Sequence, residues 1–425
     1  MTTDYVIIGG SIGALGAVEG IRRYDPRREI VVVSEEKQTL YSRPSIGKYL
    51  EGDLNEISVG FGSTDLWSTN NVKVLQGSKA LSLDAKRKSI QLDDGGCLSF
   101  HKLLLATGAR PILPRIGGFE KSGVHTFSSV GDVQAIRAEL PRIRHAVVVG
   151  GGLIGVAAAE ALANLNVEVT IVELRNWLLS LSLSREAAAI IEGAMKQCGV
   201  NIITGLSVKE IEGRKECPSE VGGVVLSDES RLSCDLVVAA IGVTPRTELA
   251  LQAGIKVNRG ILVDRFMQTN VPGIYACGDV AEGYSFLEGK NQVLPLWPLA
   301  RLGGRVAGSN MAGDRVEYPG GVSMSAMRYF GVPIISVGTV GQAVPENGEI
   351  LASSSRNARR EVVLVKDQVV GFTLLGDVEA AGPFFDLLRT GTKVSGFKTT
   401  LLDPSFGFAH LPEPVRNAAL MEAWS

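Results

Sequence analysis

Two stretches of the chain share one order of apolar and polar residues. Each starts with an apolar, β-branched run, passes through a glycine-rich turn into a helix-like stretch, and ends in a second apolar run that closes on an acid. The first occupies residues 5–35 and the second residues 146–173. A continuous apolar run is typical of a parallel strand that is buried on both faces. The pattern therefore predicts two βαβ units.

Other apolar runs predict further strands. Residues 102–106 and 235–241 are strand-like, and a glycine follows each within two residues. Beyond residue 320 the pattern changes to short β-like runs between turn residues, followed by one helix at 380–389. These runs are residues 332–337, 361–365 and 369–375. The change predicts a separate α+β domain with an antiparallel sheet, ending in a proline-containing tail without clear periodicity.

The composition is that of a soluble globular protein with a sizeable core. The chain has 425 residues, of which 45% are hydrophobic and 21% charged, which is compatible with two or three domains. Glycine makes up 50 of the 425 residues, or about 12%, whereas the average glycine content of proteins is about 7%. This excess indicates many tight turns and close backbone approaches. The net charge of −2 gives no reason to expect nucleic acid or an anionic membrane as a partner.

Several other classes of protein are not expected. No basic segment precedes an apolar one at the N-terminus, so we expect no signal peptide. The longest charge-free apolar stretch, residues 146–159, is shorter than the roughly 18 residues of a membrane helix. The five cysteines form no C-x-x-C pair and there are only four histidines, so no metal site is expected. Scattered, odd-numbered cysteines fit a reducing compartment, and we expect a cytoplasmic protein.

The second glycine-rich turn matches a dinucleotide-binding motif in full. Gly150 permits the tight turn, Gly152 lets the backbone approach a pyrophosphate, and Gly155 lets the helix pack on the strand. The pyrophosphate would lie at the helix N-terminus, beside Leu153 and Ile154, where unpaired N–H groups favour an anion. The alternative is a glycine-rich turn that binds no ligand.

An acid closes the strand after this turn. Glu173 is placed to hold a ribose 2′-hydroxyl. A carboxylate there repels a 2′-phosphate, which favours NADH over NADPH as the coenzyme. Arg175, two residues later, leaves NADPH open.

The first turn is a weaker version of the same motif. Gly9 is followed by Ser11 and Ala14 at the second and third glycine positions. Both residues are small, and a serine hydroxyl can donate to a phosphate. Ile12 and Gly13 lie between them. Its position at the N-terminus and the repeat near residue 150 make a second nucleotide site the favoured interpretation, with Glu35 holding the ribose.

Three more motifs stand in order around the two turns, at residues 106–111, 241–245 and 274–281. With the turns they resemble the FAD-dependent pyridine nucleotide-disulfide oxidoreductase family over nearly the whole chain. The resemblance implies an α/β fold with two Rossmann-like, three-layer ββα domains. It divides the chain into an FAD domain (1–113 and 244–319), an inserted NAD domain (114–243) and a C-terminal α+β interface domain (320–425).

The resemblance also implies which motif residues contact the cofactors. Asp279 matches the family aspartate that binds the ribityl–phosphate region of FAD, although a carboxylate at a strand end can also simply cap the next helix. The other motif residues implied in cofactor binding are Thr107, Gly108, Ala109, Arg110 and Gly242.

Residues 41–48 resemble the loop of single-FAD members of the rubredoxin-, ferredoxin- and nitrite-reductase type. Arg43 and Pro44 would then contact FAD, and Lys48 would lie near flavin N5 as the catalytic cation, where it raises the flavin potential. The alternative for Lys48 is a solvated helix residue. The acid that often pairs with this lysine is replaced by Ala157, and the next family acid, Glu160, is a solvent-facing residue in the alternative interpretation.

Two further features bear on the flavin. No cysteine occurs from residue 36 to 60, so disulfide reduction has no nucleophile, and we expect Cys277 to be an inert buried thiol. Leu296 and Trp297 resemble the family helix N-terminus that faces the flavin pyrimidine ring. Trp297 is placed to shield the isoalloxazine, and a core or interface tryptophan is the alternative.

The leading hypothesis is an NAD-reactive flavoprotein that exchanges single electrons with an iron–sulfur or rubredoxin-like partner. Residues 4–22 also resemble the FAD subunits of multi-subunit phenylglyoxylate (2-oxoacid) and tungsten aldehyde oxidoreductases, so an oligomer or complex member is expected. Alternatives are a free-standing NADH oxidase or diaphorase, a rubredoxin or ferredoxin reductase, and a non-catalytic flavin-binding protein. Arg356, Arg359 and Arg360 are either a docking patch for an acidic partner or a solvated loop.

Overall fold

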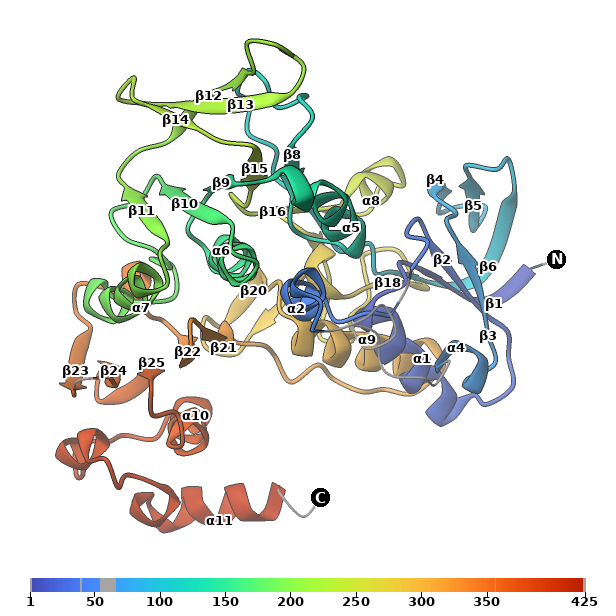
Figure 1. The fold of residues 1–425 in the computed structure, drawn as a ribbon. Coiled ribbons are helices and arrows are strands. Elements are labelled where there is room, and N and C mark those ends of the chain that lie inside the picture. The colour runs from blue at the N-terminus through green and yellow to red at the C-terminus, as the bar shows by residue number, and fades with distance from the viewer. Residues whose placement is uncertain (1, 39, 54–65, 356, 423–425) are drawn as a thin grey trace. The chain divides into compact units, whose positions relative to one another are not determined.

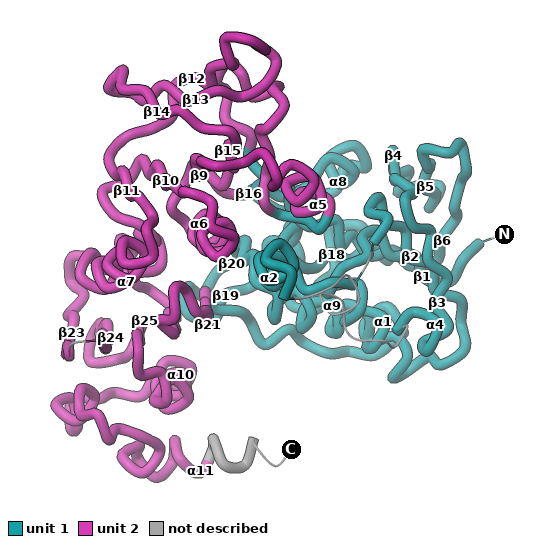
Figure 2. Tube along the Cα trace, in the orientation of Figure 1, with its two compact units in different colours: residues 1–112, 128–130, 243–322 teal, residues 113–127, 131–242, 323–425 magenta. Residues whose placement is uncertain are grey.

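The computed structural model describes residues 2–38, 40–53, 66–355 and 357–422. These form two compact units (Figure 2). Unit 1 comprises residues 1–112, 128–130 and 243–322, and unit 2 comprises residues 113–127, 131–242 and 323–425. The predicted division into three domains stays a prediction.

The central sheet of unit 1 is built on the first βαβ unit. Strands β1, β2, β3, β6 and β18 run parallel, with β1 and β18 on opposite sides of β6. Strand β5 pairs antiparallel with the start of β6, and β4 pairs antiparallel with β5 (Figure 1). The strands are β1 (Thr2–Ile8), β2 (Ile30–Ser34), β3 (Val72–Gln76), β4 (Ala80–Asp84), β5 (Ser89–Leu92), β6 (Cys97–Leu105) and β18 (Ile274–Ala276).

Smaller elements complete unit 1. Two short sheets pair β7 with β16 and join β17, β19 and β20. The strands are β7 (Ala109–Pro111), β16 (Val243–Pro245), β17 (Ile261–Leu262), β19 (Ala281–Ser285) and β20 (Lys290–Val293). The helices are α1 (Ile12–Tyr24), η1 (Arg43–Ser45), α2 (Ile46–Glu51), α4 (Leu66–Thr69), α8 (Glu248–Gln252), η3 (Gly278–Val280) and α9 (Trp297–Met311).

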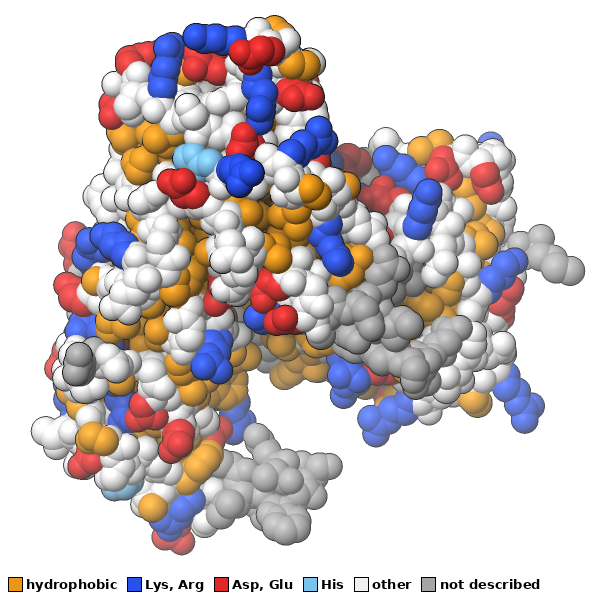
Figure 3. All heavy atoms as spheres, in the orientation of Figure 1, with side chains coloured by type: hydrophobic (Ala, Val, Ile, Leu, Met, Phe, Trp, Pro, Cys, Tyr) orange, Lys and Arg blue, Asp and Glu red, His pale blue; other side chains and the backbone are white. Residues whose placement is uncertain are grey.

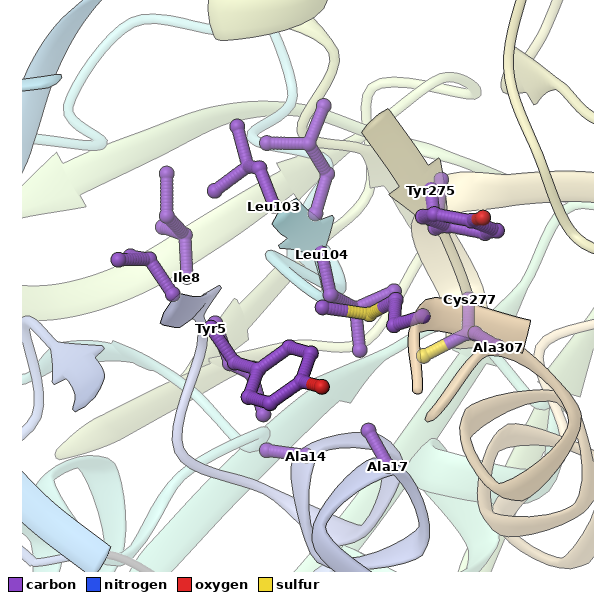
Figure 4. Packing of buried hydrophobic residues seen from close by; sticks show 14 of the residues in the cluster. Tyr5, Ile8, Ala14, Ala17, Leu103, Leu104, Tyr275, Cys277 and Ala307 are labelled. Atoms are coloured by element: carbon purple, nitrogen blue, oxygen red, sulfur yellow. The ribbon is translucent and has the colours of Figure 1, made fainter. Parts of the chain in front are cut away.

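The core of unit 1 lies between its central sheet and the helix pair α1 and α9. The apolar runs that predicted strands supply its buried side chains, and Figure 4 shows Leu103 and Leu104 of β6 with Ala14 and Ala17 of α1 and Ala307 of α9. Each of these residues is 0% exposed. Burial of apolar surface is the main stabilising contribution of this layer.

Helices α1 and α9 pack backbone against backbone. A Cβ atom placed on Gly16 would lie 2.2 Å from the carbonyl oxygen of Arg301, and one on Gly20 would lie 2.2 Å from that of Arg305. Gly308 on the facing helix is equally close to Ala17, at 2.1 Å from its oxygen. We call this contact the glycine seam. It runs in the same direction along both helices, so both helix N-termini lie at one end of the pair.

Unit 2 contains the second βαβ unit and the C-terminal sheet. Its parallel sheet has the order β11-β10-β9-β15-β8, and a three-stranded antiparallel sheet, β12-β13-β14, adjoins it. The elements are β8 (Val124–Thr126), α5 (Val130–Glu139), η2 (Leu140–Arg142), β9 (His145–Val149), α6 (Leu153–Asn164), β10 (Glu168–Glu173), α7 (Arg185–Gln197), β11 (Asn201–Thr204), β12 (Val208–Gly213), β13 (Val221–Leu226), β14 (Arg231–Ser233) and β15 (Leu236–Ala239).

The C-terminal part of unit 2 is an antiparallel five-stranded sheet, ordered β21-β22-β25-β24-β23. The prediction of an antiparallel sheet and of the helix after it is confirmed. The elements are β21 (Met324–Tyr329), β22 (Val332–Gly338), η4 (Gly341–Ala343), β23 (Glu349–Ser354), β24 (Arg359–Val365), β25 (Gln368–Leu375), α10 (Ala381–Thr390), η5 (Lys398–Leu402), η6 (Phe408–His410) and α11 (Glu413–Glu422).

The surface carries both signs of charge. On the face shown in Figure 3, basic and acidic side chains are interspersed and do not gather into a patch of one sign. Among the helices of the described ranges, none combines the length and apolar character needed to cross a membrane.

Candidate cofactor sites

The first glycine-rich turn connects β1 to α1 and packs on the end of β6. Gly9 has φ +115°, and a Cβ atom there would lie 2.1 Å from the carbonyl oxygen of Ala106, so only glycine fits. Ser11 is the N-cap of α1, yet its hydroxyl makes no capping hydrogen bond. The N–H groups of Ala14 and Leu15 donate to the Ser11 carbonyl, so the hydroxyl and the N–H groups of Ile12 and Gly13 are the ones available to a phosphate.

The second turn, between β9 and α6, has the geometry that its three glycines predict. Gly150 has φ +105°, and a Cβ there would lie 2.5 Å from the carbonyl oxygen of Ala240. A Cβ on Gly155 would lie 1.9 Å from the carbonyl oxygen of Gly150, which is the close helix–strand packing. Gly152 differs, because a Cβ there would meet nothing within 4 Å. That open space, at the N-cap of α6, fits the approach of a dinucleotide pyrophosphate.

Glu173 ends β10 beside this turn. Its Oε2 accepts a hydrogen bond of 2.5 Å from the Gly151 N–H, and its Oε1 accepts one of 2.7 Å from the Arg175 N–H. Each carboxylate oxygen keeps acceptor capacity for a ribose hydroxyl. The structure thus holds the carboxylate next to the glycine-rich turn, where a ribose would follow the pyrophosphate.

Glu35, at the end of β2, has a partner that sequence reasoning missed. The Arg246 guanidinium donates to it through Nη1, and Lys79 lies 3.9 Å away. The Nε of Arg246 is buried and has no partner within the described part of the chain. A buried donor without an acceptor is costly, and this one fits a site that a ligand completes. The only sequence signal for Arg246 is its position directly after the motif at 241–245.

Two of the family-like motifs are joined to each other. Strands β7 and β16 pair antiparallel, the Thr107 hydroxyl donates to the Arg246 carbonyl at 3.0 Å, and the Arg246 N–H donates to that of Gly108 at 3.0 Å. Arg110 pairs with Glu248. Gly108 has φ +67° with open space on its Cβ side. These contacts hold the chain segment from Thr107 to Arg110, including Ala109 in β7, close to the first glycine-rich turn.

Gly242 belongs to unit 2. It has φ +116° and immediately precedes β16. Its predicted contact with a cofactor stays a prediction.

Asp279 lies in η3, just after β18, and is the carboxylate that the family resemblance assigns to FAD. Burial raises its pKa, and the Arg43 guanidinium partly offsets this effect. No hydrogen bond to Asp279 occurs within the described ranges, so the carboxylate caps no helix there. A partly buried carboxylate left without a donor fits a ligand hydroxyl.

Arg43 is fixed by three neighbours in the same unit. It donates to the Ser128 carbonyl at 2.7 Å, pairs with Glu36, and its guanidinium carbon lies 5.2 Å from the Tyr41 ring centre. Burial alone would lower the pKa of Arg43, but these groups and Asp279 together raise it, so the guanidinium stays charged. Glu36 and Tyr41 were not predicted as site residues. Pro44 follows in the first turn of η1.

Lys48 has an acidic partner on its own segment. Its ammonium lies 2.7 Å from a Glu51 oxygen, one turn later on α2, and 3.5 Å from Asp53. The hydrogen bond with Glu51 raises the pKa of Lys48. The lysine is half-exposed. Glu51 is thus a local acidic partner of Lys48, and the predicted flavin role of Lys48 stays a prediction.

We expect Lys48→Met to keep FAD bound and to lower the flavin reduction potential, because it removes a cation that would stabilise negative charge on reduced flavin. Glu51→Gln should raise the potential, because it removes the carboxylate that pairs with the ammonium. The potential is measured by anaerobic reductive titration beside a reference dye. Lys86→Met, on an exposed turn of the same unit, is the control, and equal potentials in all variants would remove Lys48 from the flavin site.

Trp297 is the first residue of α9, after the N-cap Leu296. It is partly buried and packs against the unit 1 core, in agreement with the core alternative, while its shielding of a flavin stays a prediction. Cys277 is 1% exposed, and burial raises its pKa to about 12. The thiol is therefore protonated at neutral pH and unreactive.

Two sets of unit 2 residues that the sequence allowed to be solvent-facing, Glu160 and the arginines near residue 360, form contacts within the unit. Glu160 accepts a 2.5 Å hydrogen bond from the Phe330 N–H, so it does not simply face solvent. Arg359 pairs with Glu361 at 2.5 Å, and Arg360 is 7% exposed and donates to the Leu401 and Asp403 carbonyls. Arg360 is buried, so the predictions of a docking patch and of a solvated loop are wrong for it, whereas Arg359 is partly buried and both predictions stay predictions there. Arg356 lies outside the described residues.

Comparison with known proteins identifies the family of this chain and several relatives. The family model described as pyridine nucleotide-disulphide oxidoreductase matches residues 3–304. The epsilon subunit of an NADH-dependent phenylglyoxylate dehydrogenase from Aromatoleum evansii is 34% identical over 352 residues, which cover 82% of each chain. A nitrite reductase [NAD(P)H] from Bacillus subtilis is 28% identical over 402 residues, 94% of this chain but only 49% of that protein. The chain thus spans about half the length of that relative.

A solved structure shows the same fold. The NAD-dependent persulfide reductase from A. fulgidus has a TM-score of 0.87 and 28% identity, and the match covers 99% of this chain and 83% of that one. The predicted fold class and the expected cofactors FAD and NAD(H) are confirmed. The chain belongs to the pyridine nucleotide-disulphide oxidoreductase family, and with it to the FAD-dependent oxidoreductases that react with NAD(H).

Proposed function

We propose that this chain is the NAD-reactive subunit of an electron-transfer system that exchanges single electrons with an iron–sulfur partner. Its setting would be a cytoplasmic multi-subunit complex that oxidises an aldehyde or a 2-oxoacid. The similarity to the epsilon subunit of a phenylglyoxylate dehydrogenase supports this proposal. The five cysteines, all free, agree with a reducing compartment.

The observation that carries the proposal is the lack of a reactive thiol beside the flavin site. Residues 36–60 contain no cysteine, and Cys277, which follows β18, is buried with a pKa of about 12. The other cysteine of unit 1, Cys97, is the first residue of β6. It lies roughly 27 Å along the strand from Leu105, the end of β6 that is next to the first glycine-rich turn. Within unit 1, thiol–disulfide exchange therefore has no nucleophile beside the site, which favours transfer of electrons to an external acceptor.

The chain contributes binding and orientation. FAD, when bound, supplies the chemistry that links a two-electron hydride donor to one-electron carriers. Asp279 and the first glycine-rich turn would hold this cofactor at two points, and the turn at Gly150–Gly155 would hold the coenzyme. Lys48 would place a positive charge beside the flavin ring, which favours uptake of hydride.

The test is anaerobic NADH oxidation by the FAD-loaded chain. We expect fast reduction of a one-electron dye and of a small bacterial ferredoxin, slow use of oxygen in air, and no change after alkylation of the accessible cysteines with iodoacetamide. Fast oxygen use with slow dye reduction would replace the proposal with a free-standing NADH oxidase. Flavin that NADH does not bleach would indicate a non-catalytic flavin-binding protein.

A further inference from the structure

The segment after Glu173 is held by the C-terminal part of the same unit. We call residues 174–184 the coenzyme loop. The Ser336 hydroxyl donates to the Ser182 carbonyl at 2.7 Å, and the Ser184 hydroxyl donates to Glu361 at 2.6 Å. On its other side, the Leu179 N–H donates to the Gly151 carbonyl at 2.8 Å. The loop therefore lies between the glycine-rich turn and the C-terminal sheet.

The short helix η4 approaches this loop with no side chain between them. Gly341 has φ +56°, and a Cβ there would lie 2.7 Å from the Ser180 carbonyl oxygen and 2.9 Å from that of Leu183. The next N–H, that of Gln342, donates to the Ser180 carbonyl at 3.3 Å. Only glycine permits this approach, and the approach fixes where the Gln342 side chain begins.

The side chain of Gln342 is hydrogen-bonded to the side chain of Arg175. The Arg175 guanidinium donates through Nη1 to the Gln342 side-chain oxygen. Arg175 is exposed, and no carboxylate within the described ranges forms an ion pair with it. Its positive charge is therefore not neutralised, although the neutral amide fixes its direction.

This pairing bears on how the coenzyme is selected. NADPH differs from NADH by a 2′-phosphate, which needs a cation with a fork of N–H donors and is repelled by an acid such as Glu173. Arg175 is two residues from Glu173 and is the cation in the coenzyme loop that lies nearest to it in sequence. We propose that Gln342 determines coenzyme specificity by withholding the Arg175 guanidinium from a 2′-phosphate, so that Glu173 acts unopposed and NADH is preferred.

The proposal rests on the coenzyme site at Gly150–Gly155 and not on the identity of the electron partner. Direct binding of oxidised coenzymes to the FAD-loaded chain tests it by calorimetry, without turnover. We expect Gln342→Ala to tighten NADP⁺ binding by about 10-fold, the value of one charge-assisted hydrogen bond, while NAD⁺ binding stays within about two-fold. Gln342→Glu should weaken NADP⁺ binding, because a carboxylate holds the arginine more firmly.

The double variant makes the test specific. Arg175→Ala combined with Gln342→Ala should lose the whole gain in NADP⁺ affinity, because the released group is Arg175. A gain that persists in the double variant, or an equal change for both coenzymes in Gln342→Ala, would overturn the proposal. If Gly152→Ala also left NAD⁺ binding unchanged, the coenzyme site itself would be misplaced, whereas a failed ferredoxin assay would leave this inference intact.

Discussion

Replacing Asp279 by Asn is expected to weaken FAD binding by roughly 10- to 150-fold, which corresponds to the 1.5–3 kcal/mol of a hydrogen bond to a charged group. The carboxylate lies in a partly buried position after β18 and has no donor within the described part of the chain. A ligand hydroxyl would supply that donor. Asparagine keeps the size of the side chain and one acceptor but removes the charge. Asp279→Ala should lose more FAD than the asparagine variant.

The measurement is calorimetric titration of the apoprotein with FAD, beside the flavin-to-protein absorbance ratio of the purified variant. Asp84→Asn is the matched control, because it removes one charge from the exposed end of β4 in the same unit and keeps an acceptor for the Lys86 and Arg87 N–H groups. A dissociation constant for Asp279→Asn equal to that of the control would remove Asp279 from the FAD site.

Gly152→Ala is expected to raise the dissociation constant and the KM for NADH by about 10- to 100-fold, since small misplacements at a binding site have effects of this size. The added methyl group has open space in the ligand-free chain, and the Gly152 φ of −80° suits alanine. We therefore expect an unchanged melting temperature and unchanged FAD content. The methyl group would occupy the space that the pyrophosphate needs.

Two other glycines of unit 2 make this result interpretable. Gly193 in α7 also has open space for a Cβ, so Gly193→Ala should leave NADH binding unchanged and stabilise the helix by about 0.5–1 kcal/mol. Gly155→Ala should lower the melting temperature, because its Cβ would lie 1.9 Å from the Gly150 carbonyl oxygen. Normal NADH affinity in Gly152→Ala would exclude this turn as the coenzyme site.

The parts of the site that follow from local pattern were predictable from sequence. The glycine spacing and the apolar runs on both sides identified both turns, because each rule acts over a few residues of chain. Glu173 was placed beside its turn for the same reason, since a parallel strand returns to the same sheet edge. The fold class followed from the repetition of this unit and from the motifs between the copies.

The remaining features depend on contacts between distant parts of the chain. Arg246 meets Glu35 across 211 residues, and no local pattern carries that pairing. Arg360 looks solvated in sequence because its partners arrive from elsewhere, among them the Leu401 and Asp403 carbonyls. The sheet β12-β13-β14 was also missed, since its short strands contain glycine and charged residues that weaken the alternation of a strand.

At the glycine seam between α1 and α9, no side chain from these glycines separates the two helix backbones. Side chains between helices can change rotamer and let the helices shift, but here backbone atoms set the separation, through Gly16, Gly20 and Gly308. The two helix N-termini, with Ser11 at one and Leu296 at the other, are consequently held at a spacing that other substitutions in the core cannot tune. The distance between the two helix N-termini is therefore fixed by the backbone, and a cofactor that binds at both of them has to fit that distance.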